Sequence, residues 1–123
     1  ERIVPLEKDG RRFWFRAFHV CGQVFLTWWN ELTHVYETLQ QPEIERYGLE
    51  SLPCIVKAIA RVCRLNFFST EIVLDPSGRL VAVDYVNESC DLRLQSRHND
   101  GIPDEVVRGI AAVIADFIGR ELS

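Results

Sequence analysis

A hairpin is the strongest structural signal in this chain. Two apolar runs, Phe67–Leu74 and Leu80–Val86, flank the segment Asp75–Gly78, which has the sequence DPSG. β-Branched and aromatic residues favour strands, and Pro and Gly in these places are typical of a tight reversal. The sequence therefore predicts an antiparallel pair of strands over residues 67–86.

Two acidic residues, Glu71 and Asp84, interrupt these apolar strands. Burying a carboxylate is costly unless a cation or hydrogen-bond donors compensate its charge. Hard cations such as Mg2+ prefer oxygen ligands, so two acids on one face of a hairpin are candidates for a magnesium site. The alternative is a surface hairpin whose acids are solvated.

The register of the hairpin decides whether the two acids share a face, because side chains alternate along a strand. We expect a type I turn with an even loop, which makes the two carboxylates diagonal neighbours with backbones roughly 7–8 Å apart. A three-residue loop with a bulge at Gly78 would instead send the acids to opposite faces. The expected register pairs Leu74 with Arg79, Glu71 with Ala82, and Asp84 with Ser69.

Size and composition restrict the class of protein. The chain has 123 residues, 47% of them apolar, which is enough for one domain with its own core. Its net charge is −4 and its basic residues are scattered, so the charge pattern of a nucleic-acid binder is missing. No run of 18 apolar residues and no secretion signal occurs, so we expect no membrane segment and a cytoplasmic location.

The cysteines and the missing methionine add two expectations. The four cysteines have no CxxC spacing, and Cys54 and Cys63 fall within a helical apolar pattern, which predicts buried, reduced thiols. The sequence contains no methionine, not even at position 1. We therefore expect residues 1–123 to be a single domain cut from a longer polypeptide.

The first part of the chain predicts a second hairpin. Residues 12–20 alternate, with Phe13, Phe15, Ala17 and His19 on one face, which is typical of a strand. The segment Cys21–Gln23 turns the chain into another apolar strand, Val24–Trp29. The adjacent Trp28 and Trp29 then point to opposite faces, one into the core and one towards a partner. Residues Asn30–Gly48 are interpreted as a polar, irregular connection with a short helical piece.

Two amphipathic helices follow from apolar residues that recur at three- and four-residue intervals. Ser51 is expected to cap the first helix, and Pro103 opens the second at Asp104. The order hairpin, helix, hairpin, helix predicts an α+β fold, an antiparallel sheet with helices packed on one face. The apolar positions are Ile55, Val56, Ile59, Val62 and Cys63 in the first helix, and Val106, Val107, Ile110, Val113, Ile114, Phe117 and Ile118 in the second.

This order and its motifs resemble the C-terminal lobe of the ATP-grasp superfamily, the fold of D-alanine–D-alanine ligase, glutathione synthetase and biotin carboxylase. The resemblance covers residues 12–87 well and the last helix loosely. Its most specific part is the spacing from Glu71 to Asp84. The matching features are Arg16 six residues before the hairpin Gly22, Glu71 in a strand that follows a helix, the Asp75–Gly78 turn, and Asp84 and Asn87 at the end of the second strand.

The resemblance implies cofactors and a reaction. Glu71 and Asp84, with Asn87 as a third ligand, would hold Mg2+ ions that bridge the phosphates of ATP, and Arg16 would contact the same phosphates. The implied enzyme is an ATP-dependent carboxylate–amine or carboxylate–thiol ligase, in which an acyl phosphate forms before the nucleophile displaces phosphate. Positioned metal ions suit this step because charge develops on phosphoryl oxygens.

One motif departs from the family pattern. The family places its Asn two residues after the second acid, whereas Asn87 follows Asp84 by three. Strand alternation would send these two residues to opposite faces, so Asn87 needs a bulge or the end of the strand at Val86 to reach the site. Glu88 is the alternative ligand.

The resemblance also implies partners. A second ATP-binding lobe with phosphate-gripping lysines would lie upstream, so the isolated piece should not turn over substrate. In the polar loop Cys90–Gly101, Arg93 and Arg97 are candidates for holding a small-molecule carboxylate substrate, and the alternative is a solvated loop. For Arg16 the alternative is a side chain that extends over neighbouring aromatics to reach water.

Two alternatives for the whole chain stay open. One is a catalytically silent ATP-grasp-like module kept for binding or interaction, and the other is an unrelated α+β interaction domain. Assembly into a homodimer is also open.

Overall fold

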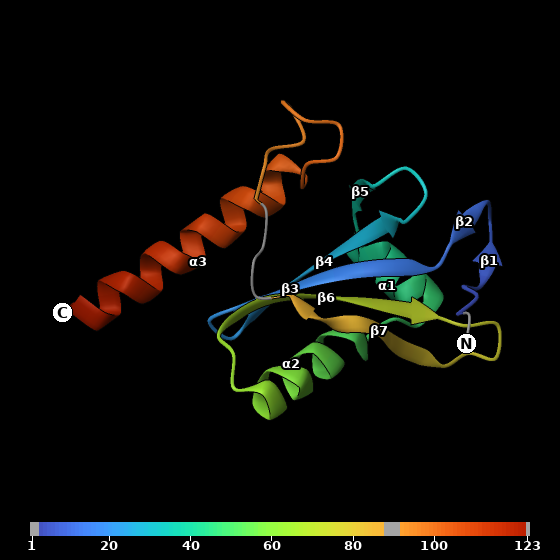
Figure 1. Ribbon diagram of the computed structural model, residues 1–123, viewed down its shortest axis with the longest axis horizontal. Coiled ribbons are helices and arrows are strands. Elements are labelled where there is room, and N and C mark those ends of the chain that lie inside the picture. The colour runs from blue at the N-terminus through green and yellow to red at the C-terminus, as the bar shows by residue number, and fades with distance from the viewer. Residues whose placement is uncertain (1–2, 88–91, 123) are drawn as a thin grey trace.

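The computed structural model describes residues 3–87 and 92–122, and it confirms the α+β class (Figure 1). A five-stranded antiparallel sheet has the order β5-β4-β3-β6-β7, and a separate two-stranded sheet is formed by β1 and β2. The strands are β1 (Glu7–Lys8), β2 (Arg11–Arg12), β3 (Trp14–Val20), β4 (Gln23–Asn30), β5 (Val35–Thr38), β6 (Phe67–Leu74) and β7 (Leu80–Asn87). The helices in the described residues are α1 (Gln41–Tyr47), α2 (Leu52–Cys63) and α3 (Asp104–Leu122).

Helices cover both faces of the large sheet, so the expectation that they pack on one face was wrong. In Figure 1, α2 lies below the sheet and α3 lies above it, with its C-terminal half extending beyond the strands. The reason is the central strand β3, which is apolar on both sides. Phe15 and Ala17 belong to the core under α1 and α2, whereas Phe18 and Val20 belong to the core under α3.

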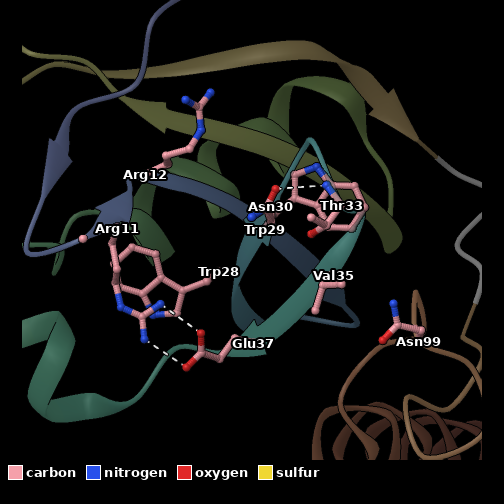
Figure 2. A pocket seen from close by; sticks show the side chains of 10 residues that line it. Arg11, Arg12, Trp28, Trp29, Asn30, Thr33, Val35, Glu37 and Asn99 are labelled. Carbon is pink, nitrogen blue, oxygen red and sulfur yellow. Dashed lines mark hydrogen bonds and ion pairs between the residues drawn. The ribbon is translucent and has the colours of Figure 1, made fainter.

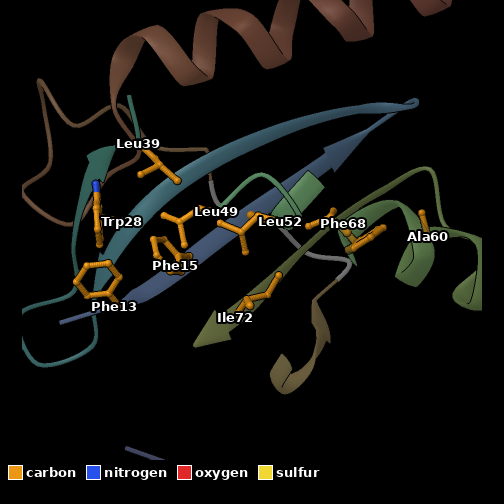
Figure 3. Close-up of a cluster of buried hydrophobic side chains, with 11 residues drawn as sticks. Phe13, Phe15, Trp28, Leu39, Leu49, Leu52, Ala60, Phe68 and Ile72 are labelled. Carbon is orange, nitrogen blue, oxygen red and sulfur yellow. The ribbon is translucent and has the colours of Figure 1, made fainter. Parts of the chain in front are cut away.

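The larger core joins α1 and α2 to the sheet (Figure 3). Aromatic rings dominate it, with Phe13 and Phe15 meeting Trp28 at centroid distances of 5.2 and 4.9 Å. The smaller core under α3 contains Ile102, Val106 and Ile110. Trp28 therefore lies in one core and Trp29 packs at the edge of the other, which confirms that they point to opposite faces.

The β3–β4 turn follows the sequence closely. Val20 pairs with Gln23, which leaves Cys21 and Gly22 as a two-residue loop. Both have positive φ, 47° and 90°, as a type I′ turn requires. Glycine at the second position adopts this conformation without strain, and Cys21 is held there by the strands on either side.

The segment Asn30–Gly48 is more regular than expected, because it contains β5 and α1. The side chain of Asn30 accepts hydrogen bonds from the backbone of Leu32 and Thr33 and so reverses the chain into β5. At the start of α1, the Glu43 carboxylate accepts a hydrogen bond from the backbone N–H of Gln40. These local contacts form a strand and a helix too short to show a periodic apolar pattern.

Helix α2 begins as expected, but its buried side differs from the expected one. Ser51 occupies the N-cap position without a capping hydrogen bond from its side chain. The buried residues are Leu52, Val56 and Ala60. Cys54 and Cys63 are exposed, as is Val62, so their predicted burial was wrong. The helix covers the sheet along a narrow line with a four-residue spacing, and its last turn extends into solvent.

Candidate functional site

The β6–β7 turn uses the three-residue loop rather than the even loop. The Gly78 N–H donates to the Asp75 carbonyl at 3.0 Å, and the Asp75 N–H donates to the Arg79 carbonyl at 2.9 Å. Gly78 has a φ of 91°, which is the bulge conformation that favours glycine. Leu74 consequently pairs with Leu80, so the predicted pairing of Leu74 with Arg79 was wrong. The even loop that would have made Glu71 and Asp84 diagonal neighbours on one face is therefore not the loop that forms.

This change shifts the pairing of the candidate metal ligands. Glu71 pairs with Val83 instead of Ala82. The register then shifts between Glu71 and Ser69, so that Ser69 pairs with Asn87 instead of Asp84. With Glu71 opposite Val83, strand alternation gives position 87 the face of Glu71 without a bulge, and the irregular stretch of the pairing is the one that contains Asp84. The side chains of Asp84 and Asn87 lie outside the described residues, as does the whole of Glu88, so their roles as metal ligands stay predictions.

Two of the predicted site residues, Arg16 and Glu71, are direct neighbours. They pair across β3 and β6, the two adjacent central strands, and lie on the face that α3 covers at one end. The indole N–H of Trp14 donates to the Glu71 carboxylate at 2.9 Å. Paired residues in an antiparallel sheet have close Cβ atoms, so a ligand at this place contacts a carboxylate and a guanidinium together.

The guanidinium of Arg16 is held by aromatic groups rather than by an acid. Its carbon lies 5.1 Å from the centre of the Trp29 ring, and one Nη donates to the Tyr36 hydroxyl at 3.3 Å. Its Nε is buried without a hydrogen-bond partner. Among the described side chains, no carboxylate forms an ion pair with Arg16. The carboxylate of the paired residue, Glu71, is hydrogen-bonded to Trp14 and forms no ion pair with Arg16.

A pocket of about 340 Å³ places Arg93 beside Arg16. The loop that carries Arg93 precedes the first residue of α3, Asp104, and within this loop Arg93 donates to the Asp100 carboxylate at 3.0 Å. Arg97 belongs to the same loop but does not line this pocket, as far as the described residues show. The remaining lining residues are Trp29, His34, Tyr36 and Asp100.

Sequence reasoning missed most of these lining residues. Tyr36 and His34 lie in or beside β5, which was interpreted as irregular, and Asp100 is one of many polar residues in its loop. Only Trp29 was indicated by the sequence, because adjacent residues in a strand point to opposite faces and one of the two indoles must therefore lie outside the larger core. The ring of Trp29 stacks on His34 at a centroid distance of 5.6 Å and tilts against Tyr36 at 4.6 Å.

Within residues 3–87 and 92–122, no group of three His, Cys, Asp or Glu residues is arranged to hold a metal ion. Beside Arg16 in β6, the described side-chain oxygens on this face are those of Glu71 and Ser69, and the pocket next to Arg16 adds the Tyr36 hydroxyl and the Asp100 carboxylate. A magnesium ion here would depend on oxygens from β7 and from its own ligand.

A second pocket, of about 530 Å³, lies at the edge of the sheet near β5 (Figure 2). Arg11 donates two hydrogen bonds of 2.9 Å to the Glu37 carboxylate, and its guanidinium lies 4.4 Å from the Trp28 ring. The hydrogen bond from Arg11 holds the pKa of Glu37 below its ordinary value, although partial burial acts in the opposite direction. Arg12 is paired with Glu31 and Glu7. Each of these arginines has a carboxylate partner within the chain, which is typical of a structural contact, although Arg12 Nε and Glu31 Oε2 are buried without a hydrogen bond.

Comparisons of the chain with protein-family models, with curated proteins and with solved structures gave no match. None of the helices in the described part of the chain is both long enough and apolar enough to cross a membrane.

Proposed function

We propose that this chain is the C-terminal nucleotide- and Mg2+-binding part of an ATP-dependent carboxylate–amine or carboxylate–thiol ligase that acts through an acyl phosphate. The observation that carries the proposal is the pairing of Arg16 with Glu71 on one face of the central strands. ATP and Mg2+ would be the cofactors, and an upstream lobe would supply the remaining nucleotide contacts.

The state of Arg16 supports a phosphate ligand. The Arg16 guanidinium has no carboxylate partner among the described residues, and its Nε is buried without a hydrogen bond. An oxyanion that accepts hydrogen bonds from this guanidinium would therefore bind favourably. Trp29 and Tyr36 hold its plane in place, so little side-chain freedom is lost on binding. In the proposed reaction Arg16 would contact the transferred phosphoryl group, where negative charge has to be stabilised.

The backbone of β6 and β7 supports a metal at Glu71. Ser69 is the next residue on the face of Glu71, and Ser69 pairs with Asn87. Asp84 lies within the irregular part of β7, between the pairs at Val83 and Asn87. Glu71, Asp84 and Asn87 are the proposed Mg2+ ligands, with the Trp14 indole orienting the Glu71 carboxylate as an outer partner. Position 87 shares the face of Glu71, whereas Asp84 requires the irregular part of β7 to bring it to that face.

The position of Arg93 supports a substrate next to the nucleotide. It lines the same pocket as Arg16, so a small-molecule carboxylate bound to Arg93 would lie within reach of the phosphoryl group. Arg93 is the proposed substrate contact, and Arg97, which does not line that pocket, is proposed only as an outer contact.

Binding of ATP with and without Mg2+, measured by isothermal titration calorimetry, tests the proposal. The chain should bind Mg2+–ATP with a dissociation constant on the order of 1 mM, weak because half of the contacts would come from another lobe. Glu71→Gln and Asp84→Asn should each weaken Mg2+–ATP binding by more than about tenfold while leaving metal-free ATP binding unchanged. Arg16→Gln should weaken both.

Glu45→Gln is the matched control, because Glu45 is exposed and the variant has the same change in charge as Glu71→Gln. It should bind as the unmodified chain does. Mg2+–ATP binding that is no tighter than metal-free ATP binding, or that is not weakened in Asp84→Asn, would contradict the metal assignment. In a longer polypeptide with both lobes, nucleotide binding without ADP release would identify the silent module instead of the ligase.

A further inference from the structure

The face of the sheet opposite Arg16 and Glu71 carries a separate basic pocket of about 480 Å³. It lies where the C-terminal half of α2 meets the β3–β4 turn and the segment that leads into β6. Its polar lining side chains are His19 from β3, Lys57, Arg61 and Arg64 from α2 and its C-cap, and Asn66.

The charge of this pocket is uniformly positive. Lys57, Arg61 and Arg64 are spaced by four and three residues, so they share one side of the helix. No acidic residue lines the pocket, and none of the three cations forms an ion pair with a described carboxylate. The chain as a whole has a net charge of −4, so this concentration of positive charge goes against its overall composition.

His19 adds a buried polar group to the same pocket. The residue is only 5% exposed, and its ring stacks on Phe68 at a centroid distance of 5.2 Å. Nδ1 lies 3.3 Å from the backbone carbonyl of Asn66, which assigns the ring proton to Nδ1 in the neutral form. The other ring nitrogen, Nε2, has no hydrogen-bond partner among the described residues. Nε2 is not among the side-chain atoms that are both buried and unpaired, so it is exposed to the pocket, where a ligand can contact it.

The helix dipole explains only part of this arrangement. Cations in the last turn of a helix stabilise its free carbonyl groups, which accounts for Arg61 and Arg64. Lys57 lies almost two turns earlier, and His19 belongs to a different element. The helix dipole therefore does not explain why Lys57 and His19 lie beside the two arginines, whereas binding of an anionic ligand does.

We propose that this pocket binds a phosphate group, either as inorganic phosphate or as the terminal group of a phosphomonoester. A guanidinium donates two parallel hydrogen bonds to phosphate oxygens and an ammonium adds a compact charge, so this set of side chains matches a small dianion. The net negative charge of the chain would repel an extended polyanion such as nucleic acid. The site lies on the opposite face of the sheet from Arg16, so it is independent of the proposed nucleotide site.

Nuclear magnetic resonance titration of the chain with inorganic phosphate at constant ionic strength tests the proposal. The ring signals of His19 and the amide signals of Gly22 and Arg64 should shift and saturate with a dissociation constant on the order of 1 mM. The double variant Lys57→Gln, Arg61→Gln should weaken binding by about tenfold or more. Lys57 and Arg61 are both exposed, so the double variant should retain the fold.

Arg108→Gln and Arg120→Gln in one chain form the matched control, because they remove two exposed charges from α3. This control should change the dissociation constant by less than about twofold, since screening weakens distant charges. Shifts that do not saturate, or that weaken equally in the control, would overturn the proposal.

A parallel titration with glycerol 3-phosphate distinguishes the two sources. Tighter binding of the ester would identify a phosphomonoester as the ligand, and equal binding would identify the phosphate group alone. Binding of neither probe would overturn the proposal.

Discussion

At the scale of single residues, Arg11 shows how this protein uses its exposed charges. It contacts Glu37 through two hydrogen bonds of 2.9 Å, reaches Glu43 at 3.4 Å, and covers the Trp28 ring. The side chain of Glu37 is 61% exposed, so water and salt screen much of the attraction. The contact therefore joins β5 to the β1–β2 hairpin and contributes less than about 1 kcal/mol to the free energy of unfolding.

This ion pair predicts a pH-dependent effect of Glu37→Gln. Because the pKa of Glu37 is lowered in the folded chain, mainly by the Arg11 hydrogen bond, its contribution is complete above the ordinary glutamate pKa. The contribution is lost as the pH falls through the lowered pKa. Urea unfolding at pH 7 should show Glu37→Gln less stable than the unmodified chain, by up to about 1 kcal/mol. The difference should shrink towards zero near pH 3.

Glu45→Gln provides the reference for this experiment, because Glu45 is an exposed acid on α1 with no described ion pair. Its stability should follow that of the unmodified chain at both pH values. An equal loss of stability for Glu37→Gln at pH 3 and pH 7 would show that packing, not charge, explains the contact.

At the scale of elements, the turn between β6 and β7 sets the register of the proposed metal site. The Asp75 carboxylate accepts hydrogen bonds from the Ser77 hydroxyl at 2.6 Å and from the backbone of Ser77 and Arg79 at 3.0 and 2.9 Å. These bonds, led by the Ser77 hydroxyl, lower the pKa of Asp75. The charged carboxylate thus organises the loop, while Gly78 supplies the positive φ that closes it.

Gly78→Ala should test how firmly this register is held. Alanine at a φ of 91° is strained, which should lower the free energy of unfolding by roughly 1–2 kcal/mol. No atom lies within 4 Å of the added Cβ, so the cost comes from the backbone and not from a clash. Urea denaturation measures the change.

Gly119→Ala is the comparison for this variant, since its Cβ also meets no atom within 4 Å and Gly119 has no positive φ. It should leave stability unchanged or raise it slightly, as expected for alanine near a helix end. If Gly78→Ala were as stable as Gly119→Ala, the hairpin would have an alternative turn, and the register of Glu71 would not be fixed by Gly78.

This turn also shows how far the sequence could predict the structure. The strands around it, the helix that begins at Asp104 and the alternation from Phe13 to Val20 were predictable, because each has a clear apolar period. The register was not, since the sequence DPSG allows either loop length and only the backbone of Gly78 decides between them. Strand β5 was missed because its four residues are too few for a pattern, and Tyr36 was missed with it.

At the scale of the whole molecule, the sheet serves two cores and two proposed sites. Strand β3 gives alternate residues to both faces, so Phe15 packs under α2 while Phe18 packs under α3. The same alternation places Arg16 and His19 on opposite faces, which separates the proposed nucleotide site from the basic pocket. One strand therefore positions groups of both sites. A change that destabilises the core on one face of the sheet should also destabilise the core on the other face.

The shared strand predicts that both cores unfold in one transition. Leu52→Ala and Ile110→Ala each remove a fully buried side chain, the first from α2 and the second from α3. Each should lower the free energy of unfolding by about 2–5 kcal/mol. In both variants the urea transition followed by tryptophan fluorescence should coincide with the transition followed by far-ultraviolet circular dichroism.

Ile118→Ala distinguishes the docked half of α3 from the half that extends beyond the sheet. Ile118 is 50% exposed, so its truncation should change stability by less than about 0.5 kcal/mol. If Ile110→Ala lowered only the midpoint seen by circular dichroism, while the tryptophan transition stayed where it is in the unmodified chain, α3 would detach independently. The sheet would then need only α1 and α2 to fold.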